Sequence, residues 1–300
     1  MSIQILAIAS TARSQSSLTI DASGCSSLQG TWSDSTSTCT VTQTLTNVQN
    51  SSIVVPDGAT LVLVTLQNYG GIGVYGSLFF NNGTSSNYGT IHITSSGTIY
   101  NNGTINNYDS GYVIDEGSMT NDKGGRMDDF GRINVIGTLQ NNGGIYLESG
   151  GELSVYGTLW NGGGIINYGE FYNQGTVNTY DFINNEATFD NVGTVDNTDV
   201  INNYGIFMND CGGILTGTGT FNGNDVTTSC STTSQTSSSA MTTTTEVPSN
   251  GTGTGAGGNS TGYGYSGDVP EFQFQGALGP AALTLVVALA YLGVRSRART

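Results

Sequence analysis

The chain has 300 residues, of which 10% are charged and 36% are hydrophobic, below the roughly 45–50% apolar content of an ordinary globular domain. Residues 1–294 hold all 22 acids against four of the seven bases, and this excludes a nucleic-acid binder that depends on a basic face. One histidine, His92, and four widely separated cysteines exclude a zinc-type ligand cluster.

Residues 1–14 contain a short apolar run, from Ile3 to Ala9, with no basic segment before it. We interpret them as a weak or truncated signal peptide. Residues 15–57 follow as an N-terminal cap that contains Cys25 and Cys39. With Cys211 and Cys230, three disulfide pairings are possible, and the local pairing, Cys25 with Cys39 and Cys211 with Cys230, would place one bridge at each end of the central domain.

Residues 58–225 form the central domain and repeat a short unit, Gly-x-apolar-x-Asn-x. From Leu153 to Phe207 the apolar residue recurs every six positions, and between Ile99 and Leu153 it recurs every six or eight, with one vacancy at Gly125. Three units therefore make a 20-residue repeat in the first part and an 18-residue repeat in the second. A fixed period of this length is typical of a solenoid, in which only the stack of repeats is stable.

Each unit is suited to a short strand whose central side chain points inward, followed by a corner built from Asn-x-Gly. Three strands and three corners make one triangular coil, and stacked coils about 4.8 Å apart would align the apolar residues into a core and the asparagines into amide ladders. The prediction is an all-β, single-stranded parallel β-helix. The length of the coils in the first part favours a right-handed winding.

Residues 226–269 are nearly all Ser, Thr, Gly and Asn and predict a disordered stalk. Within residues 270–300, the 19 uncharged residues from Gly276 to Val294 would span about 28 Å as a helix, enough to cross a bilayer. The tail that follows contains three arginines, so we expect this tail in the cytoplasm and the rest of the chain outside. Sequons for N-glycosylation occur at Asn50, Asn82, Asn102, Asn250 and Asn259.

The run from Cys25 through SSLQGTWSDSTST to Cys39, then VVPDGATLVLV and GTIYNNGTINNY, resembles archaeal cell-surface proteins in which a cysteine cap leads into Asn/Gly-rich β-helical repeats. Pro270-Glu271-Phe272, before an apolar segment and an arginine-rich tail, resembles the archaeal PEF-type sorting signal. The resemblance implies export, membrane anchoring and processing by an archaeosortase. It implies no catalytic residues.

Two pairs of acids are candidate ligands for a hard cation such as Ca²⁺. Asp181 and Asp199 are one 18-residue coil apart, and Asp128 and Glu148 are one 20-residue coil apart, so we expect each pair to stack. Asp129, Arg132, Glu152, Lys123 and Arg126 would complete a mixed-charge patch around the second pair. Tyr108, Tyr156, Tyr168, Tyr180 and Tyr204 recur just after the asparagine position, where they would stack on sugars or pack along the corners.

These features predict a membrane-anchored extracellular β-helical protein that is a structural component of the cell envelope or an adhesin. Its expected partners are the membrane, through residues 276–294, and envelope glycans or neighbouring surface proteins. The alternative is a surface polysaccharide lyase or glycoside hydrolase of the β-helix type, which would use the mixed-charge patch as its site.

Overall fold

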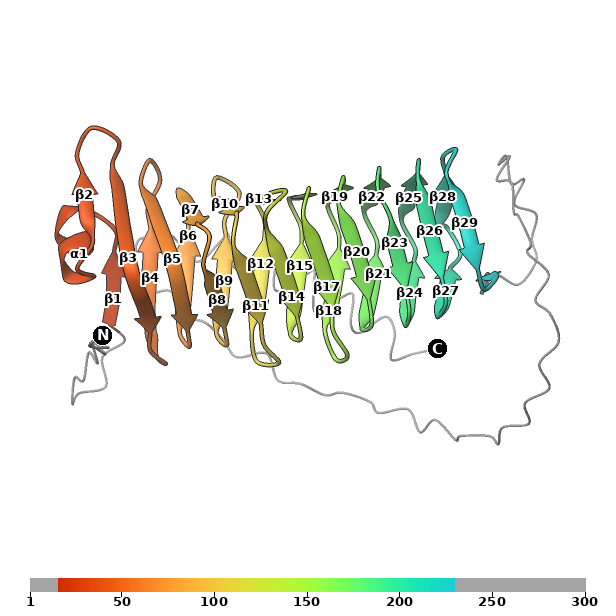
Figure 1. Cartoon of the computed structure of the whole chain (residues 1–300), viewed down its shortest axis with the longest axis horizontal. Coiled ribbons are helices and arrows are strands. Elements are labelled where there is room, and N and C mark those ends of the chain that lie inside the picture. Colours follow the sequence, from red (N-terminus) through yellow and green to blue (C-terminus); the bar gives the residue numbers. More distant parts are fainter. Residues whose placement is uncertain (1–15, 230–300) are drawn as a thin grey trace. The chain divides into compact units, whose positions relative to one another are not determined.

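The computed structural model describes residues 16–229, which form a three-sided parallel β-solenoid of about 10 coils (Figure 1). The predicted parallel β-helix is therefore confirmed. The expected signal peptide at residues 1–14, the stalk beyond residue 229 and the apolar segment at 276–294 lie outside the described residues. Among residues 16–229 no helix is long and apolar enough to cross a membrane.

Face one is an 11-stranded parallel sheet. In order along the rod its strands are β1 (Ser16–Thr19), β4 (Ser51–Val55), β6 (Gly71–Val74), β9 (Thr90–Ile93), β12 (Tyr112–Asp115), β15 (Arg132–Val135), β18 (Glu152–Val155), β21 (Glu170–Asn173), β24 (Thr188–Asn191), β27 (Ile206–Asn209) and β30 (Val226–Thr227).

Faces two and three share the long strands β3 (Thr38–Asn47) and β5 (Thr60–Asn68), because the first half of β5 pairs with β7 and its last residues pair with β8. Face two continues as β7 (Ser77–Phe80), β10 (Thr98–Asn101), β13 (Ser118–Asn121), β16 (Thr138–Asn141), β19 (Thr158–Asn161), β22 (Thr176–Thr179), β25 (Thr194–Asn197) and β28 (Ile214–Thr216). Face three continues as β8 (Thr84–Asn87), β11 (Thr104–Asn107), β14 (Arg126–Asp129), β17 (Gly144–Leu147), β20 (Gly164–Asn167), β23 (Ile183–Asn185), β26 (Val200–Asn203) and β29 (Thr220–Gly223).

The first coil differs from the others and begins before the expected boundary at residue 58. β1 already pairs in parallel with β4, and β3 pairs with β5, so most of the predicted cap belongs to the solenoid. The helix α1 (Ala22–Ser27) and β2 (Thr31–Ser33), which is antiparallel to β3, fill the end of this coil. The Cys25–Cys39 disulfide ties α1 to β3. Cys211 is also disulfide-bonded, and Cys230, its expected partner, lies outside the described residues.

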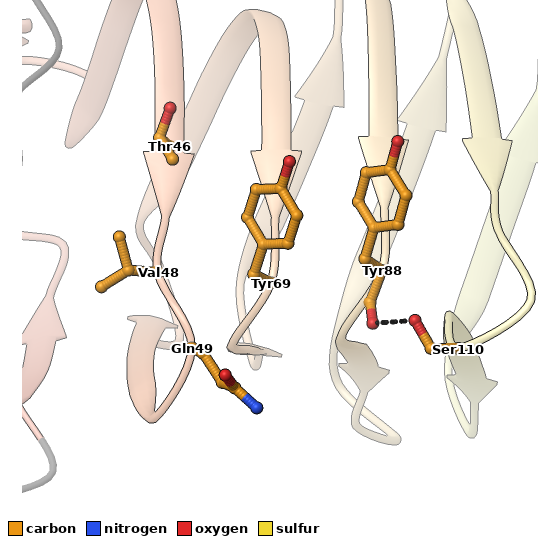
Figure 2. Close-up of a pocket in the computed structure, with 6 residues that line it drawn as sticks. All are labelled: Thr46, Val48, Gln49, Tyr69, Tyr88 and Ser110. Carbon is orange, nitrogen blue, oxygen red and sulfur yellow. Dashed lines mark hydrogen bonds between the residues drawn. The ribbon is translucent and has the colours of Figure 1, made fainter.

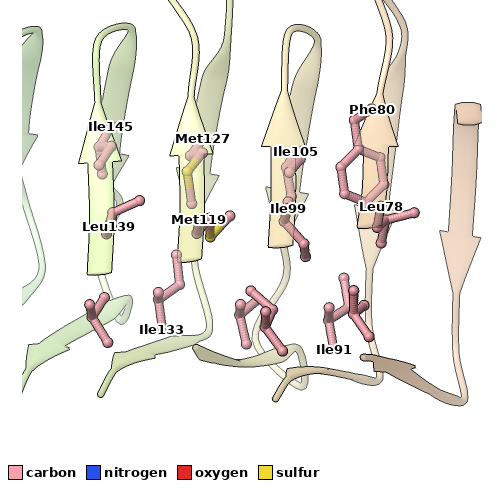
Figure 3. Close-up of a cluster of buried hydrophobic side chains, with 14 of the residues drawn as sticks. Leu78, Phe80, Ile91, Ile99, Ile105, Met119, Met127, Ile133, Leu139 and Ile145 are labelled. Carbon is pink, nitrogen blue, oxygen red and sulfur yellow. The ribbon is translucent and has the colours of Figure 1, made fainter. Parts of the chain in front are cut away.

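The core is built from two inward positions in each four-residue strand, because alternate side chains of a strand point to opposite faces. The first inward position carries a large apolar residue, and these residues stack in the predicted columns (Figure 3). Ile99, Met119 and Leu139 are paired across one face in the 20-residue register. Ile165, Ile183 and Ile201 are paired in the 18-residue register.

The expected vacancy at Gly125 is wrong. Met127 fills that place in the column, where it is 1% exposed and pairs with Ile105 on one side and Ile145 on the other. The corner at residues 122–125 is a longer turn than its neighbours. The next strand therefore starts two residues later than it would if the six-residue spacing continued. Extra residues are thus absorbed in corners, and the strands keep their alignment.

The second inward position carries asparagine in most coils, and the predicted amide ladders are confirmed. Each ladder asparagine is nearly or fully buried, and within a ladder its Nδ2 donates to the side-chain oxygen of the residue one coil on, up to the last member, Asn203, whose Nδ2 donates to the backbone carbonyl of Asn224. Successive Nδ2–Oδ1 distances of 2.7–2.8 Å join Asn47, Asn68, Asn87 and Asn107 in one column, Asn101, Asn121, Asn141 and Asn161 in a second, and Asn167, Asn185 and Asn203 further along the first.

The corner glycines are required for a reason other than the one expected. Their sequence pattern suggests a left-handed backbone, yet Gly137, Gly157 and Gly175 do not have positive φ. A Cβ on any of them would overlap the backbone carbonyl oxygen of the corner in the preceding coil. Close approach between coils, rather than the backbone angle, therefore excludes a side chain there.

Ile183→Asp should unfold the coils around it, whereas Thr176→Asp should change stability little. Ile183 is 0% exposed between Ile165 and Ile201, so a charge there has no partner and should cost several kcal/mol. Thr176 is on the outer surface of β22, half-exposed. Urea denaturation of both variants measures the difference. Equal losses of stability would contradict the observed orientation of the strands.

Candidate functional site

The residues predicted to form one mixed-charge patch are divided between two faces and the interior. Arg126 and Asp128 form an ion pair on the outer surface of face three, with Nε 2.7 Å from Oδ1. Arg132 and Glu152 pair on face one, with Nε 3.5 Å from Oε2, as their predicted register requires. Asp129 points into the core and is 0% exposed.

The predicted stacking of Asp128 on Glu148 is wrong. Asp128 is aligned with Tyr146, because the coil at this level of the rod is short and Met127 is paired with Ile145. The guanidinium of Arg126 lies 3.9 Å from the centre of the Tyr146 ring. Arg126 therefore forms both an ion pair with Asp128 and a cation–π contact with Tyr146. The predicted pair of Asp128 and Glu148 is not formed, and the polysaccharide-cleaving alternative stays a prediction.

Asp181 and Asp199 do lie one coil apart, because Ile183 and Ile201 that follow them are paired. The Oδ1 of Asp181 accepts a hydrogen bond of 2.8 Å from the backbone N–H of Phe182. Within residues 16–229 no group of three or more potential metal ligands is assembled. The calcium site stays a prediction, and thermal melting with EDTA and then with added Ca²⁺ tests it.

The three sequons within the described residues are all accessible. Asn50, Asn82 and Asn102 are exposed, and the first two adopt the left-handed backbone conformation, with φ of 63° and 53°. Asn82 and Asn102 lie at the same corner in successive coils, with a distance of 3.4 Å between Oδ1 and Nδ2. Asn250 and Asn259 lie outside the described residues.

A polar cluster on the outer surface of face one pairs its members internally. The hydroxyl of Tyr112 accepts from Nδ2 of Asn134 at 2.6 Å, and Oε1 of Glu152 accepts from Oγ of Ser154 at 2.9 Å. Burial raises the pKa of Tyr112 above its usual value. Ser154 is 1% exposed and donates to a carboxylate, so its hydroxyl is held within the surface of the sheet.

A row of aromatic rings extends along one corner of the rod, and we call it the corner array. Its members are Tyr69, Tyr88, Tyr108 and Phe130, each directly after an inward position of the third face. Successive ring centroids are 4.9, 4.4 and 5.9 Å apart, with interplanar angles of 4°, 1° and 10°. Four consecutive coils therefore present parallel rings.

A hollow of about 540 Å³ lies at the first end of the corner array and is lined by Thr46, Val48, Gln49, Tyr69, Tyr88 and Ser110. Figure 2 shows the two tyrosine rings in the same orientation, with their hydroxyls pointing the same way. The Oγ of Ser110 donates 2.8 Å to the backbone carbonyl of Tyr88, which fixes the serine beside the array. The hollow thus combines the apolar surface of two tyrosine rings with neutral hydroxyl and amide groups that can form hydrogen bonds.

From the sequence we predict only one of the four rings of the corner array. Tyr108 was among the predicted tyrosines, but Tyr69, Tyr88 and Phe130 were not. The signal was present, because Asn-Tyr recurs at residues 68–69, 87–88 and 107–108, close to one coil apart. Of the other predicted tyrosines, Tyr168 and Tyr204 lie at the same corner without an aromatic neighbour, and Tyr156 and Tyr180 lie at other corners.

Residues 16–229 therefore define a protein of the three-sided parallel β-solenoid class, with an uninterrupted core and a row of aromatic residues on one edge. Comparison with known proteins found no matching family model, no matching curated protein and no matching solved structure.

Two aspartates occupy inward positions of the rod, Asp129 at the end of a ladder and Asp115 between Ile93 and Val135. Asp115 and Asp129 are both 0% exposed, and the Oδ2 atom of each has no hydrogen-bond partner. The Oδ1 of Asp129 accepts from Nδ2 of Asn107 at 2.7 Å, and the next residue in its column is Leu147. Burial raises the pKa of each carboxyl to about 7, because an ionised group would lie unsolvated among neutral side chains.

The rod should lose stability as the pH rises from about 4 to about 7. In this range the native state keeps protons on Asp115 and Asp129 that the unfolded chain, with a carboxyl pKa of about 3.9, has released. The free energy of unfolding should then fall by up to about 1.4 kcal/mol per pH unit for each group. Urea midpoints measured between pH 4 and pH 8 give this slope.

Asp129→Asn should flatten the slope and stabilise the rod at pH 8, because an amide carries no charge to bury. Asp109→Asn, at an exposed corner, is the matched control and should leave the slope in place. A wild-type protein whose stability rises over the same pH range would show that the two buried carboxyls do not hold protons.

Proposed function

We propose that the protein is a rod-shaped component of the cell surface, exported and held at the membrane by residues 276–294, with a structural or adhesive role. The observation that carries this proposal is the solenoid itself, whose coils are joined by a continuous apolar core and by buried amide ladders. Such a rod resists local opening because each coil is covered by its neighbours. In the sequence it precedes a Ser/Thr/Gly-rich stretch and an apolar segment with a basic tail.

The Cys25–Cys39 disulfide supports a location outside the cytoplasm, where such bonds form and persist. It lies in the first coil of the described residues and joins α1 to β3, and both cysteines are 0% exposed. The low content of charged residues and the accessible sequons at Asn50, Asn82 and Asn102 agree with an exported, glycosylated surface.

Deleting residues 276–300 should release the protein from the membrane fraction into the medium, because this deletion removes the continuous apolar segment that is long enough to span a bilayer as a helix. Deleting only residues 295–300 is the matched control: it keeps the apolar segment, and the protein should stay with the membrane. Fractionation followed by immunoblotting gives the result. A truncated chain that remains in the membrane fraction would contradict the proposed anchor.

A further inference from the structure

The corner array is fixed by the backbone of the solenoid. The N–H groups of Tyr69, Tyr88 and Tyr108 donate to the carbonyl oxygens of Asn47, Asn68 and Asn87 in the preceding coil, at 2.8, 2.7 and 2.9 Å. The Cα atoms that carry the rings are therefore held one coil apart, as in any parallel ladder. A ligand that contacts several rings at once meets a preformed surface, and little conformational entropy is lost on binding.

The array has two defined ends. At the corresponding position of the first coil the chain has Val48, and beyond Phe130 it has Glu148. Tyr69, the terminal ring, is 43% exposed and borders the hollow. Beyond this ring the hollow offers the amide of Gln49 and the hydroxyl of Thr46 next to an apolar side chain (Figure 2).

This combination of groups matches one class of ligand. Because neighbouring rings of the array stack and cover part of each other's faces, a ligand meets the outward parts of the rings and the free face of the terminal Tyr69. Aromatic surface of this kind binds apolar ligand surface, and the tyrosine hydroxyls remain able to form hydrogen bonds. Hydroxyl and amide groups beside such rings orient a ligand through a few polar contacts. A pyranose ring has both parts, a face of C–H groups and a rim of hydroxyls, and an extended polysaccharide repeats them along its length as the corner array repeats its rings.

Charge selects among polysaccharides. All six residues that line the hollow are neutral, so none of them offers a cation to a uronate or a sulfate group. The chain as a whole carries a net charge of −15, which repels anionic polymers at long range. The ligand that fits both observations is uncharged.

We propose that the corner array and the adjoining hollow form a binding site for a neutral polysaccharide, whose sugars lie along the rings of Tyr69, Tyr88 and Tyr108. The polymer runs along the edge of the rod, and its last sugar occupies the hollow beside Gln49. This inference rests on the proposed function only in one respect: a protein at the cell surface would encounter the polysaccharide there. Binding by the purified protein does not require the membrane anchor.

The test uses the purified full-length chain, made in a host that adds no N-glycans so that Asn50 carries none. Retention is measured on insoluble cellulose, chitin and mannan, on the anionic polymer pectate and on neutral lipid vesicles. Affinity electrophoresis in soluble neutral glucans and mannans then gives dissociation constants. We expect retention on at least one neutral polysaccharide and none on pectate or vesicles.

Tyr69→Ala and Tyr88→Ala should each weaken binding at least tenfold, while Tyr69→Phe, which keeps the ring, should lose less. Tyr204→Ala is the matched control, because Tyr204 lies at the same corner and is 57% exposed, but its column neighbours one coil away are Glu186 and Asn224. It should bind like the wild type. Thermal melting shows that each variant is folded.

Three results would overturn the proposal: no retention on any neutral polysaccharide, retention on pectate or vesicles alone, or an equal loss for Tyr204→Ala. Any of them leaves the surface role standing, because the release of the truncated chain tests that role separately.

Discussion

A buried amide at a corner of this rod forms its hydrogen bonds with the amide at the same corner of the next coil and with backbone groups nearby. Leaving one such group unpaired in the interior costs about 1–3 kcal/mol, so the columns of asparagine impose a register that a purely apolar core would not. Apolar side chains tolerate a small slip between coils, whereas the 2.7–2.8 Å amide contacts do not. The alignment of Tyr69, Tyr88 and Tyr108 in the corner array follows from this constraint, because each directly follows a ladder asparagine.

The same constraint explains how coils of different lengths stack in one rod. Ile105 pairs with Met127 across a long coil, and Met127 pairs with Ile145 across a shorter one, yet both pairs share one column. The extra residues leave the strands and enlarge the corners, where backbone groups can reach water. A corner therefore varies in length without disturbing the core, provided that the glycine that packs against the preceding coil is kept.

Much of this architecture could be predicted from the sequence, because a column of large apolar residues at steps of six, each followed two positions later by asparagine, allows few folds. The local pairing of Cys25 and Cys39 was also predictable. The alignment of Asp128 was not, because it depends on whether Gly125 or Met127 points inward, and that choice depends on a turn whose length the period does not give.

The N-terminal coils were missed for a different reason. Strands β3 and β5 run across a corner without the Asn-x-Gly signal, so no repeat is visible there. For the proposed binding site, residue type alone does not distinguish one exposed tyrosine from another. The alignment of the coils is needed to tell which tyrosines stack on a neighbouring ring and which, like Tyr204, do not.

The interruption of the ladders at Leu147 has a mechanical consequence. Between the coil that ends with β17 and the coil that ends with β20, Asn141 and Asn161 form the ladder contact, while the other two corners place Val135 against Val155 and Leu147 against Asn167. At the next junction two corners are linked, by Asn161 with Thr179 and by Asn167 with Asn185. The junction between these two coils, like the one before it, where Asn121 and Asn141 form the one ladder contact, therefore has fewer buried side-chain links to resist tension along the axis than the junction that follows.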